Sequence, residues 1–116
     1  MNLQSMIDKL VQEQPLIIVE GKKDKAALQK LGLHNIVVLK GMPIYKVVEQ
    51  VAAQTNECLI LTDLDSEGKK LYSKLKKDLQ WHKVKVDDKF RNFLFKETTL
   101  KHIEGIDTYV LHQEIV

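Results

Sequence analysis

Residues 58–68 read CLILTDLDSEG, an apolar run that ends in three acidic residues at alternate positions. A short segment that is apolar at every position is typical of a strand covered on both faces, as in a parallel sheet flanked by helices. Residues 58–62 therefore predict a buried strand. Asp63, Asp65 and Glu67 lie just beyond its carboxyl end.

Three other segments have the character of strands. Residues 16–19 and 36–39 are apolar throughout, like residues 58–62. Residues 84–86 alternate instead and direct Lys85 toward solvent, which is typical of a strand near the edge of a sheet. The chain therefore predicts about four strands.

Amphipathic helices separate these strands, because apolar residues recur between them at helical spacing. The first spans residues 2–14 and ends at Pro15, and the second, which Asp24 can cap, ends at Gly32. The later helices are opened by Pro43, by Ser66 or Glu67, and by Asp88. After Thr98 the pattern predicts only a helical turn up to Gly105 and an ordered segment around residues 109–111.

This alternation predicts an α/β fold, a doubly wound, Rossmann-like parallel sheet of about four strands with helices on both faces. If strand 16–19 lies beside strand 58–62, the crevice at their carboxyl ends is the point where such folds bind ligands. We expect residues 1–116 to form one domain with three parts. These are a core at residues 16–86, an N-terminal helix at 2–14 and a C-terminal helical extension at 88–116.

The composition fits a soluble globular protein, since 44% of the residues are hydrophobic and 29% are charged. The net charge of +2 is too small to indicate a polyanionic partner by itself. The single cysteine, Cys58, falls in the apolar run and predicts a buried, inert thiol. We expect a cytoplasmic protein, because no segment resembles a signal peptide or is long enough to cross a membrane.

A second acidic signal follows the strand at residues 16–19, which ends in Glu20 and Gly21. Neighbouring parallel strands lie about 4.8 Å apart, so Glu20 and Asp63 could enter one small volume. Clustered carboxylates repel one another unless a cation intervenes, and their oxygens suit Mg²⁺ or Mn²⁺ rather than zinc. Taken separately, the acids after either strand could be helix caps or part of an ordinary turn. Their combination on neighbouring strands favours a metal site.

The sequence resembles the Toprim domain in both halves of that family's signature, Val19-Glu20-Gly21 with Lys23-Asp24 and then Asp63-Leu64-Asp65-Ser66-Glu67-Gly68. Toprim domains occur in topoisomerases, bacterial primases, a ribosomal-RNA-maturing ribonuclease and several nucleases, and the resemblance covers about residues 16–86. It implies a general acid or base at Glu20, metal-binding aspartates at Asp63 and Asp65, and a further metal-binding acid at Glu67. It also implies Mg²⁺ as the cofactor, with Mn²⁺ as a substitute. We place Glu20 among the metal-binding acids as well, and expect Gly21, Asp24, Gly41 and Gly68 to shape the loops.

The sequence departs from the larger Toprim enzymes in one important respect. Topoisomerases use a nucleophilic tyrosine on a separate domain, and no separate domain is predicted here. Tyr45, Tyr72 and Tyr109 are interpreted as packing residues. The chain is more similar to small stand-alone Toprim proteins, and the run EGKKDK at residues 20–25 is similar to the RNA-maturing ribonuclease in style.

Lysines follow both acidic segments and could contact phosphates near the metal. They are Lys22, Lys23, Lys69, Lys70, Lys74 and Lys77. For the last four, a solvated helix face is the simpler interpretation. Trp81 is expected to pack rather than stack on a base. His34, His102 and His112 are scattered and show no metal-ligand spacing.

The leading hypothesis is therefore a Mg²⁺-dependent nuclease that cleaves RNA or DNA by water attack. One alternative is a non-catalytic module that binds nucleic acid or a protein partner. Another is a subunit whose catalytic or targeting parts lie on another chain. No membrane partner is expected.

Overall fold

The computed structural model describes the backbone of residues 2–115, so Val116 of the predicted C-terminal extension lies outside the described residues, as does Met1. The strands are β1 (Ile17–Val19), β2 (Ile36–Val38), β3 (Glu57–Ile60) and β4 (Lys85–Val86). The helices are α1 (Leu3–Glu13), α2 (Lys22–Lys30), α3 (Ile44–Gln54), α4 (Ser66–Trp81), α5 (Lys89–Glu97) and α6 (Ile106–Ile115), with a short 3-10 helix, η1 (Ile103–Gly105).

The four strands form one parallel sheet in the order β2-β1-β3-β4, which confirms the predicted fold class. Strand β1 lies beside β3, with Ile17 paired to Leu59 and Ile18 to Ile60. The carboxyl ends of these two strands therefore meet, as the position of the acidic residues requires. The burial predicted for the second strand is wrong in degree, since β2 is an edge strand and is only half-buried.

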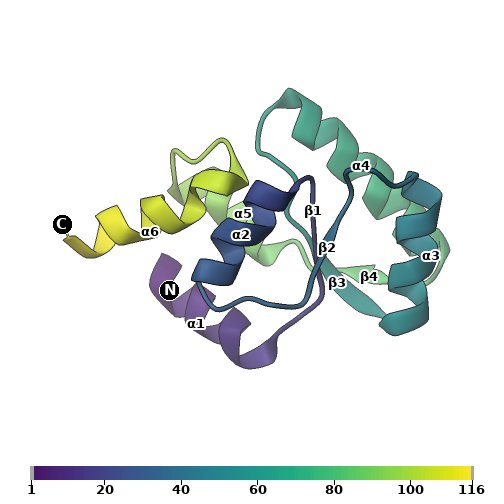
Figure 1. Cartoon of the computed structure of the whole chain (residues 1–116), viewed down its shortest axis with the longest axis horizontal. Coiled ribbons are helices and arrows are strands. Elements are labelled where there is room, and N and C mark those ends of the chain that lie inside the picture. Colours follow the sequence, from purple (N-terminus) through teal and green to yellow (C-terminus); the bar gives the residue numbers. More distant parts are fainter. Residues whose placement is uncertain (1, 116) are drawn as a thin grey trace.

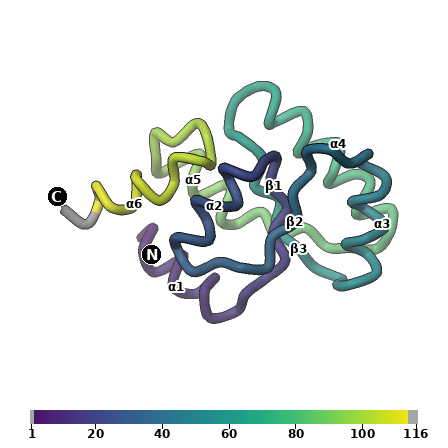
Figure 2. The backbone as a smooth tube through the Cα atoms, in the orientation of Figure 1, coloured from purple at the N-terminus to yellow at the C-terminus, as the bar shows by residue number. Residues whose placement is uncertain are grey.

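Helices cover both faces of the sheet. Successive side chains of a strand point to opposite faces, so strands that are apolar at every position present an apolar surface on each side. Ile17 and Leu59 contribute to the core shared with α1, α2, α5, η1 and α6. Ile18 and Ile60 contribute to the core shared with α3 and α4. Figure 1 shows these two groups of helices on either side of the strands, and Figure 2 shows α1 and α6 together at one side of the molecule.

The start of α2 differs from the prediction that Asp24 caps this helix. Gly21 is the N-cap, and the Asp24 carboxylate reaches back from the first turn to accept a hydrogen bond from the Gly21 N–H at 2.9 Å. This is the returning half of a capping box, which satisfies an N–H group at the helix start. The helix ends near Gly32, as predicted, where a φ of +97° favours glycine.

Cys58 is fully buried in the core beneath α3 and α4, and burial raises the pKa of its thiol to about 12. A thiol that stays protonated is a poor nucleophile, which agrees with a packing role. Within residues 2–115, no helix is long and apolar enough to cross a membrane.

Candidate metal and nucleic-acid site

Glu20 and Asp63 meet where β1 and β3 end. The Glu20 Oε2 atom accepts a hydrogen bond from the backbone N–H of Asp63 at 2.7 Å. The sheet explains this contact, since Leu61 N–H still bonds to Ile18 of the neighbouring strand at 2.8 Å, two residues before Asp63. The expectation that Glu20 and Asp63 enter one small volume is therefore met.

The loop between β3 and α4 is closed tightly on itself. Asp65 is the N-cap of α4, and its Oδ1 accepts a hydrogen bond from Gly68 N–H at 2.9 Å. The Thr62 hydroxyl donates to the Gly68 carbonyl oxygen at 2.7 Å. A Cβ atom on Gly68 would lie 1.8 Å from the Asp63 carbonyl oxygen, so only glycine fits. The capping alternative for this acidic segment is thus realised by Asp65, and it leaves the other Asp65 oxygen available.

A buried arginine supports the loop from below. Arg91 of α5 is only 3% exposed, and its guanidinium donates to the carbonyl oxygens of Thr62 and, at 3.0 Å, Asp63. The same group stacks on the ring of Tyr72, 4.6 Å from its centroid. Burial lowers the pKa of Arg91, and the opposing effects of Tyr72, Glu20 and Asp63, which raise that pKa, only partly offset the burial. Arg91 therefore holds the backbone that carries Asp63, a role that the sequence did not indicate.

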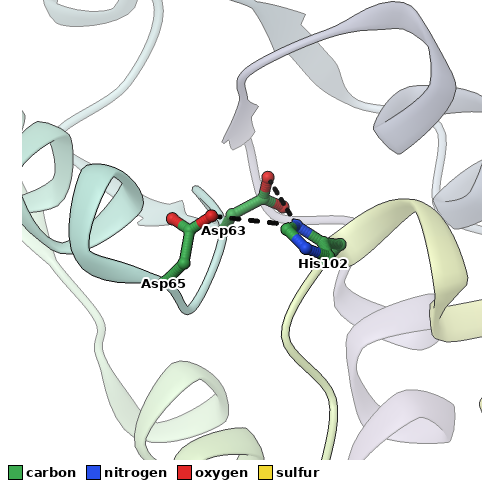
Figure 3. Close-up of side chains that lie close together, drawn as sticks. All are labelled: Asp63, Asp65 and His102. Carbon is green, nitrogen blue, oxygen red and sulfur yellow. Dashed lines mark hydrogen bonds and ion pairs between the residues drawn. The ribbon is translucent and has the colours of Figure 1, made fainter.

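The segment between α5 and η1 closes over the same loop. Leu64 N–H bonds to the Lys101 carbonyl oxygen at 2.8 Å, and Ile103 N–H bonds to Asp63 Oδ1 at 2.9 Å. Between them, His102 places its Nδ1 atom 3.3 Å from Asp63 Oδ2 and 3.9 Å from Asp65 Oδ2 (Figure 3). The hydrogen bond to Asp63, together with the negative charge of that residue, raises the pKa of His102.

Asp63, Asp65 and His102 can each offer one ligand atom, and these three atoms lie within 4.8 Å of one another. The sequence did not indicate His102 as a member of this group, because it lies 39 residues after Asp63 and no characteristic spacing relates the two positions. Glu20 faces the backbone N–H of Asp63 and is not one of the three. Glu67 lies exposed in the first turn of α4 and is also outside the group.

An open cleft of about 1050 Å³ lies beside these acids. Glu20 and Asp63 line it, and so do three lysines, namely Lys22, Lys23 and Lys40. Gly21, Asp24 and Gly41, which were expected to shape loops, also form its wall. Gly41 has a φ of +88°, a conformation that favours glycine and turns the chain after β2. Carboxylates and lysines thus line the same open groove.

The lysines of α4 lie elsewhere. None of the four that were predicted to contact phosphate lines the cleft among the described residues. Lys69 places its Nζ atom 5.2 Å from the centre of the Phe95 ring, and Lys74 pairs with Asp78 at 3.0 Å. Lys70 and Lys77 are exposed. This distribution favours a solvated helix face over a surface that tracks the substrate beside the acids.

Two aromatic residues depart from the packing that was expected of them. Trp81, at the end of α4, is 85% exposed, and Tyr45, in α3, is 60% exposed. Tyr72 and Tyr109 are partly buried against the two cores, as expected.

A family model described as the Toprim domain matches residues 15–97 of the chain. A UPF0292 protein of Pyrococcus horikoshii is 40% identical over 114 residues, which cover 97% of this chain and 85% of that protein. A UPF0292 protein of Methanocaldococcus jannaschii is 31% identical over 106 residues, which cover 88% of this chain and 83% of that protein. A solved structure of a protein from Aquifex aeolicus is 36% identical, with a TM-score of 0.83, and the match covers 90% of this chain and 97% of that one.

Proposed function

The chain belongs to the Toprim domain family, whose members are metal-binding modules of nucleic-acid metabolism, and we propose that it is a divalent-metal-dependent nuclease. The substrate would be RNA or DNA, cleaved at a phosphodiester bond by water. The observation that carries this proposal is the meeting of Glu20 with Asp63 at the wall of a cleft that also holds lysines. Negative and positive side chains together suit a metal ion and a phosphate in one place.

The donor set fits a divalent cation. Asp63 and Asp65 each retain one carboxylate oxygen that is not engaged by a backbone N–H, and both of these oxygens face His102 (Figure 3). Two such carboxylates would hold a Mg²⁺ or Mn²⁺ ion. When bound, the ion supplies positive charge that polarises the scissile phosphate and stabilises the charge that develops there.

Glu20 is placed to move a proton. Its Oε2 is occupied by the Asp63 N–H, while the residue still lines the cleft with the rest of its half-buried carboxylate. A carboxylate fixed in this way can take a proton from an attacking water or give one to the leaving oxygen. The hydrogen bond from the Asp63 N–H also fixes the orientation of the Glu20 carboxylate relative to Asp63, so a proton that Glu20 carried would lie close to the proposed metal ligands.

The lysines of the cleft would bind the nucleic-acid backbone. Lys22 and Lys23 begin α2, where the N–H groups of the first turn add a partial positive charge. Phosphate contacts of this kind carry no sequence information, so recognition would depend on the shape or flexibility of the substrate. The cleft is open, which fits a chain rather than a small enclosed ligand.

A binding module without catalysis is the second candidate, and one observation favours it. Glu20, Asp63 and Asp65 each accept a hydrogen bond from a backbone N–H, so each also has a structural role. Such a module would hold nucleic acid or a protein partner on the same surface.

The two candidates are separated by a cleavage assay on end-labelled RNA hairpins, single-stranded RNA and DNA, with Mg²⁺ and with Mn²⁺. We expect the wild-type protein to produce discrete cuts that Glu20→Gln and Asp63→Ala abolish. Glu49→Gln, which alters an exposed glutamate of α3, serves as the matched control. Binding of these substrates without any cut, in either metal, would favour the non-catalytic module. Cleavage that survives both site variants would indicate a contaminating nuclease.

A further inference from the structure

We propose that His102 is a ligand of this metal site, and that it makes the site prefer a first-row transition ion such as Mn²⁺ over Mg²⁺. The inference rests on the proposed function in that it concerns the same metal site. It goes further in naming the third ligand and the class of ion.

The two aspartates use their carboxylate oxygens in the same way. In each, Oδ1 accepts a hydrogen bond at 2.9 Å from a backbone N–H, that of Ile103 for Asp63 and that of Gly68 for Asp65. In each, Oδ2 is the oxygen that faces the His102 Nδ1 atom, at 3.3 Å and 3.9 Å. One oxygen therefore fixes each side chain, and the other points into a common space with the imidazole nitrogen (Figure 3).

The backbone of His102 is held over the loop by its two neighbours in the chain, independently of the imidazole. On one side, the Lys101 carbonyl oxygen accepts the Leu64 N–H at 2.8 Å. On the other side, Ile103 donates its N–H to Asp63 and buries its side chain completely in the core. The backbone at residue 102 is thus anchored at both neighbours, while the imidazole itself is 56% exposed. A side chain whose backbone is fixed on both sides, and which is itself open to solvent, is suited to bind an ion from solution.

A nitrogen ligand changes which divalent ion the site prefers. Mg²⁺ takes oxygen ligands and keeps much of its water, so an imidazole nitrogen adds little to its binding. Divalent ions of the first transition row accept an imidazole nitrogen more readily than Mg²⁺ does, and within that row Mn²⁺ binds a mixed nitrogen and oxygen site least tightly and the later ions more tightly. Two carboxylates and one imidazole would supply three ligand atoms, fewer than such an ion takes, so water and a phosphate could supply the others.

The test measures metal binding directly and does not depend on cleavage. Mn²⁺ and Mg²⁺ are titrated separately into the wild-type chain, His102→Gln and His102→Ala by calorimetry. Pulsed electron paramagnetic resonance of the Mn²⁺ complexes then detects any directly bound nitrogen. We expect a ¹⁴N coupling in the wild type that both variants lose. Mn²⁺ affinity should fall at least about tenfold, since removal of residues that only support a metal ligand already costs that much. Mg²⁺ affinity should change by less than about twofold, because Mg²⁺ binds oxygen ligands.

His34→Ala removes another exposed histidine and is the matched control, which should keep both the coupling and the Mn²⁺ affinity. Tight Mn²⁺ binding without a ¹⁴N coupling, or with unchanged affinity in both His102 variants, overturns this inference and leaves the metal-dependent function standing. Failure of the wild-type chain to bind either ion overturns both proposals together. Retention of the far-ultraviolet circular dichroism spectrum in the variants shows that a missing coupling reflects a missing ligand rather than an unfolded chain.

Discussion

The carboxylate of Glu20 accepts a hydrogen bond from the backbone N–H of Asp63, with 2.7 Å between oxygen and nitrogen. These residues lie 43 positions apart. Glu20 directly follows β1, and Asp63 follows Leu61 and Thr62, the two buried residues after the end of β3. The bond joins the residue proposed to carry a proton to the residue proposed to bind the metal. A substitution of Glu20 can therefore change the cleavage rate without changing the stability of the fold, or change both, depending on whether the new side chain still accepts this hydrogen bond.

Glu20→Gln is expected to abolish cleavage and to retain Mn²⁺ binding, because the amide oxygen can still accept the Asp63 N–H but cannot carry a proton. Glu20→Ala is expected to lower the free energy of unfolding by about 1 kcal/mol or more, since it leaves that half-buried N–H without its acceptor. Single-turnover cleavage rates and urea denaturation measure the two effects, with Glu49→Gln as the control. A stability loss of equal size in the Gln and Ala variants would contradict the assigned hydrogen bond.

Millimolar Mn²⁺ is expected to raise the melting temperature, because the ion binds the folded chain and relieves repulsion between Asp63 and Asp65. At one hundred times the dissociation constant the gain would be about 2.7 kcal/mol. Asp65→Asn should lose most of this response while it still caps α4, since asparagine is as good an N-cap as aspartate. Differential scanning calorimetry with and without metal measures the shift. Asp8→Asn, at an exposed site on α1, is the control. A full metal response in Asp65→Asn would rule out Asp65 as a ligand.

Gly68→Ala is expected to destabilise the fold by about 3 kcal/mol or more, because backbone rather than a flexible side chain occupies the space of the new Cβ. Gly105→Ala is the matched control. There the nearest atom to a new Cβ is 3.8 Å away, an ordinary van der Waals distance. Chemical denaturation of both variants gives the comparison. Similar stability in the two would show that the loop can open without cost.

Arg91→Met is expected to cost about 3 kcal/mol, because it keeps the buried volume but removes charged donors from two backbone carbonyl groups under the loop. Arg91→Lys should recover little of this loss, since a lysine cannot donate through a planar fork or stack in the same way on Tyr72. Urea denaturation measures both, and Lys96→Met, at an exposed position of the same helix, is the control. Full stability in Arg91→Lys would indicate that charge alone supports the loop.

Lys22→Gln combined with Lys23→Gln is expected to weaken nucleic-acid binding and to reduce its salt dependence, because these lysines line the cleft. The slope of log K against log salt should fall by about 1 for each phosphate that the variant no longer neutralises. Replacement of Lys70, Lys74 and Lys77 by glutamine should weaken binding less, since these residues lie on α4 outside the cleft. Fluorescence anisotropy at several salt concentrations compares the two sets. A larger effect from the α4 set would move the binding surface to that helix.

The start of α2 differs in one detail from the helix cap that the sequence predicts. Asp24 was expected to cap the helix from in front, but it serves from inside the first turn by accepting the Gly21 N–H. The two arrangements satisfy different N–H groups, since an acid at the N-cap accepts from the first turn and an acid in the first turn accepts from the N-cap. The sequence around an acid near a helix start is compatible with either. The prediction that β2 is fully buried was also wrong. An apolar run occurs in edge strands as well as in central ones, and only the strand order distinguishes the two.

The sequence by itself determined the parallel sheet and the position of Glu20, Asp63 and Asp65 at its carboxyl edge. It could do so because runs that are apolar at every position are stable only between two layers of helices, and residues that follow such runs must emerge at one edge. Only the tertiary structure decided that His102 faces the aspartates and that Arg91 supports them from below. Those interactions cross 28 to 39 residues, and no spacing rule relates the positions. They depend on how α5 and the buried Ile103 dock against the sheet, which is a matter of packing in three dimensions.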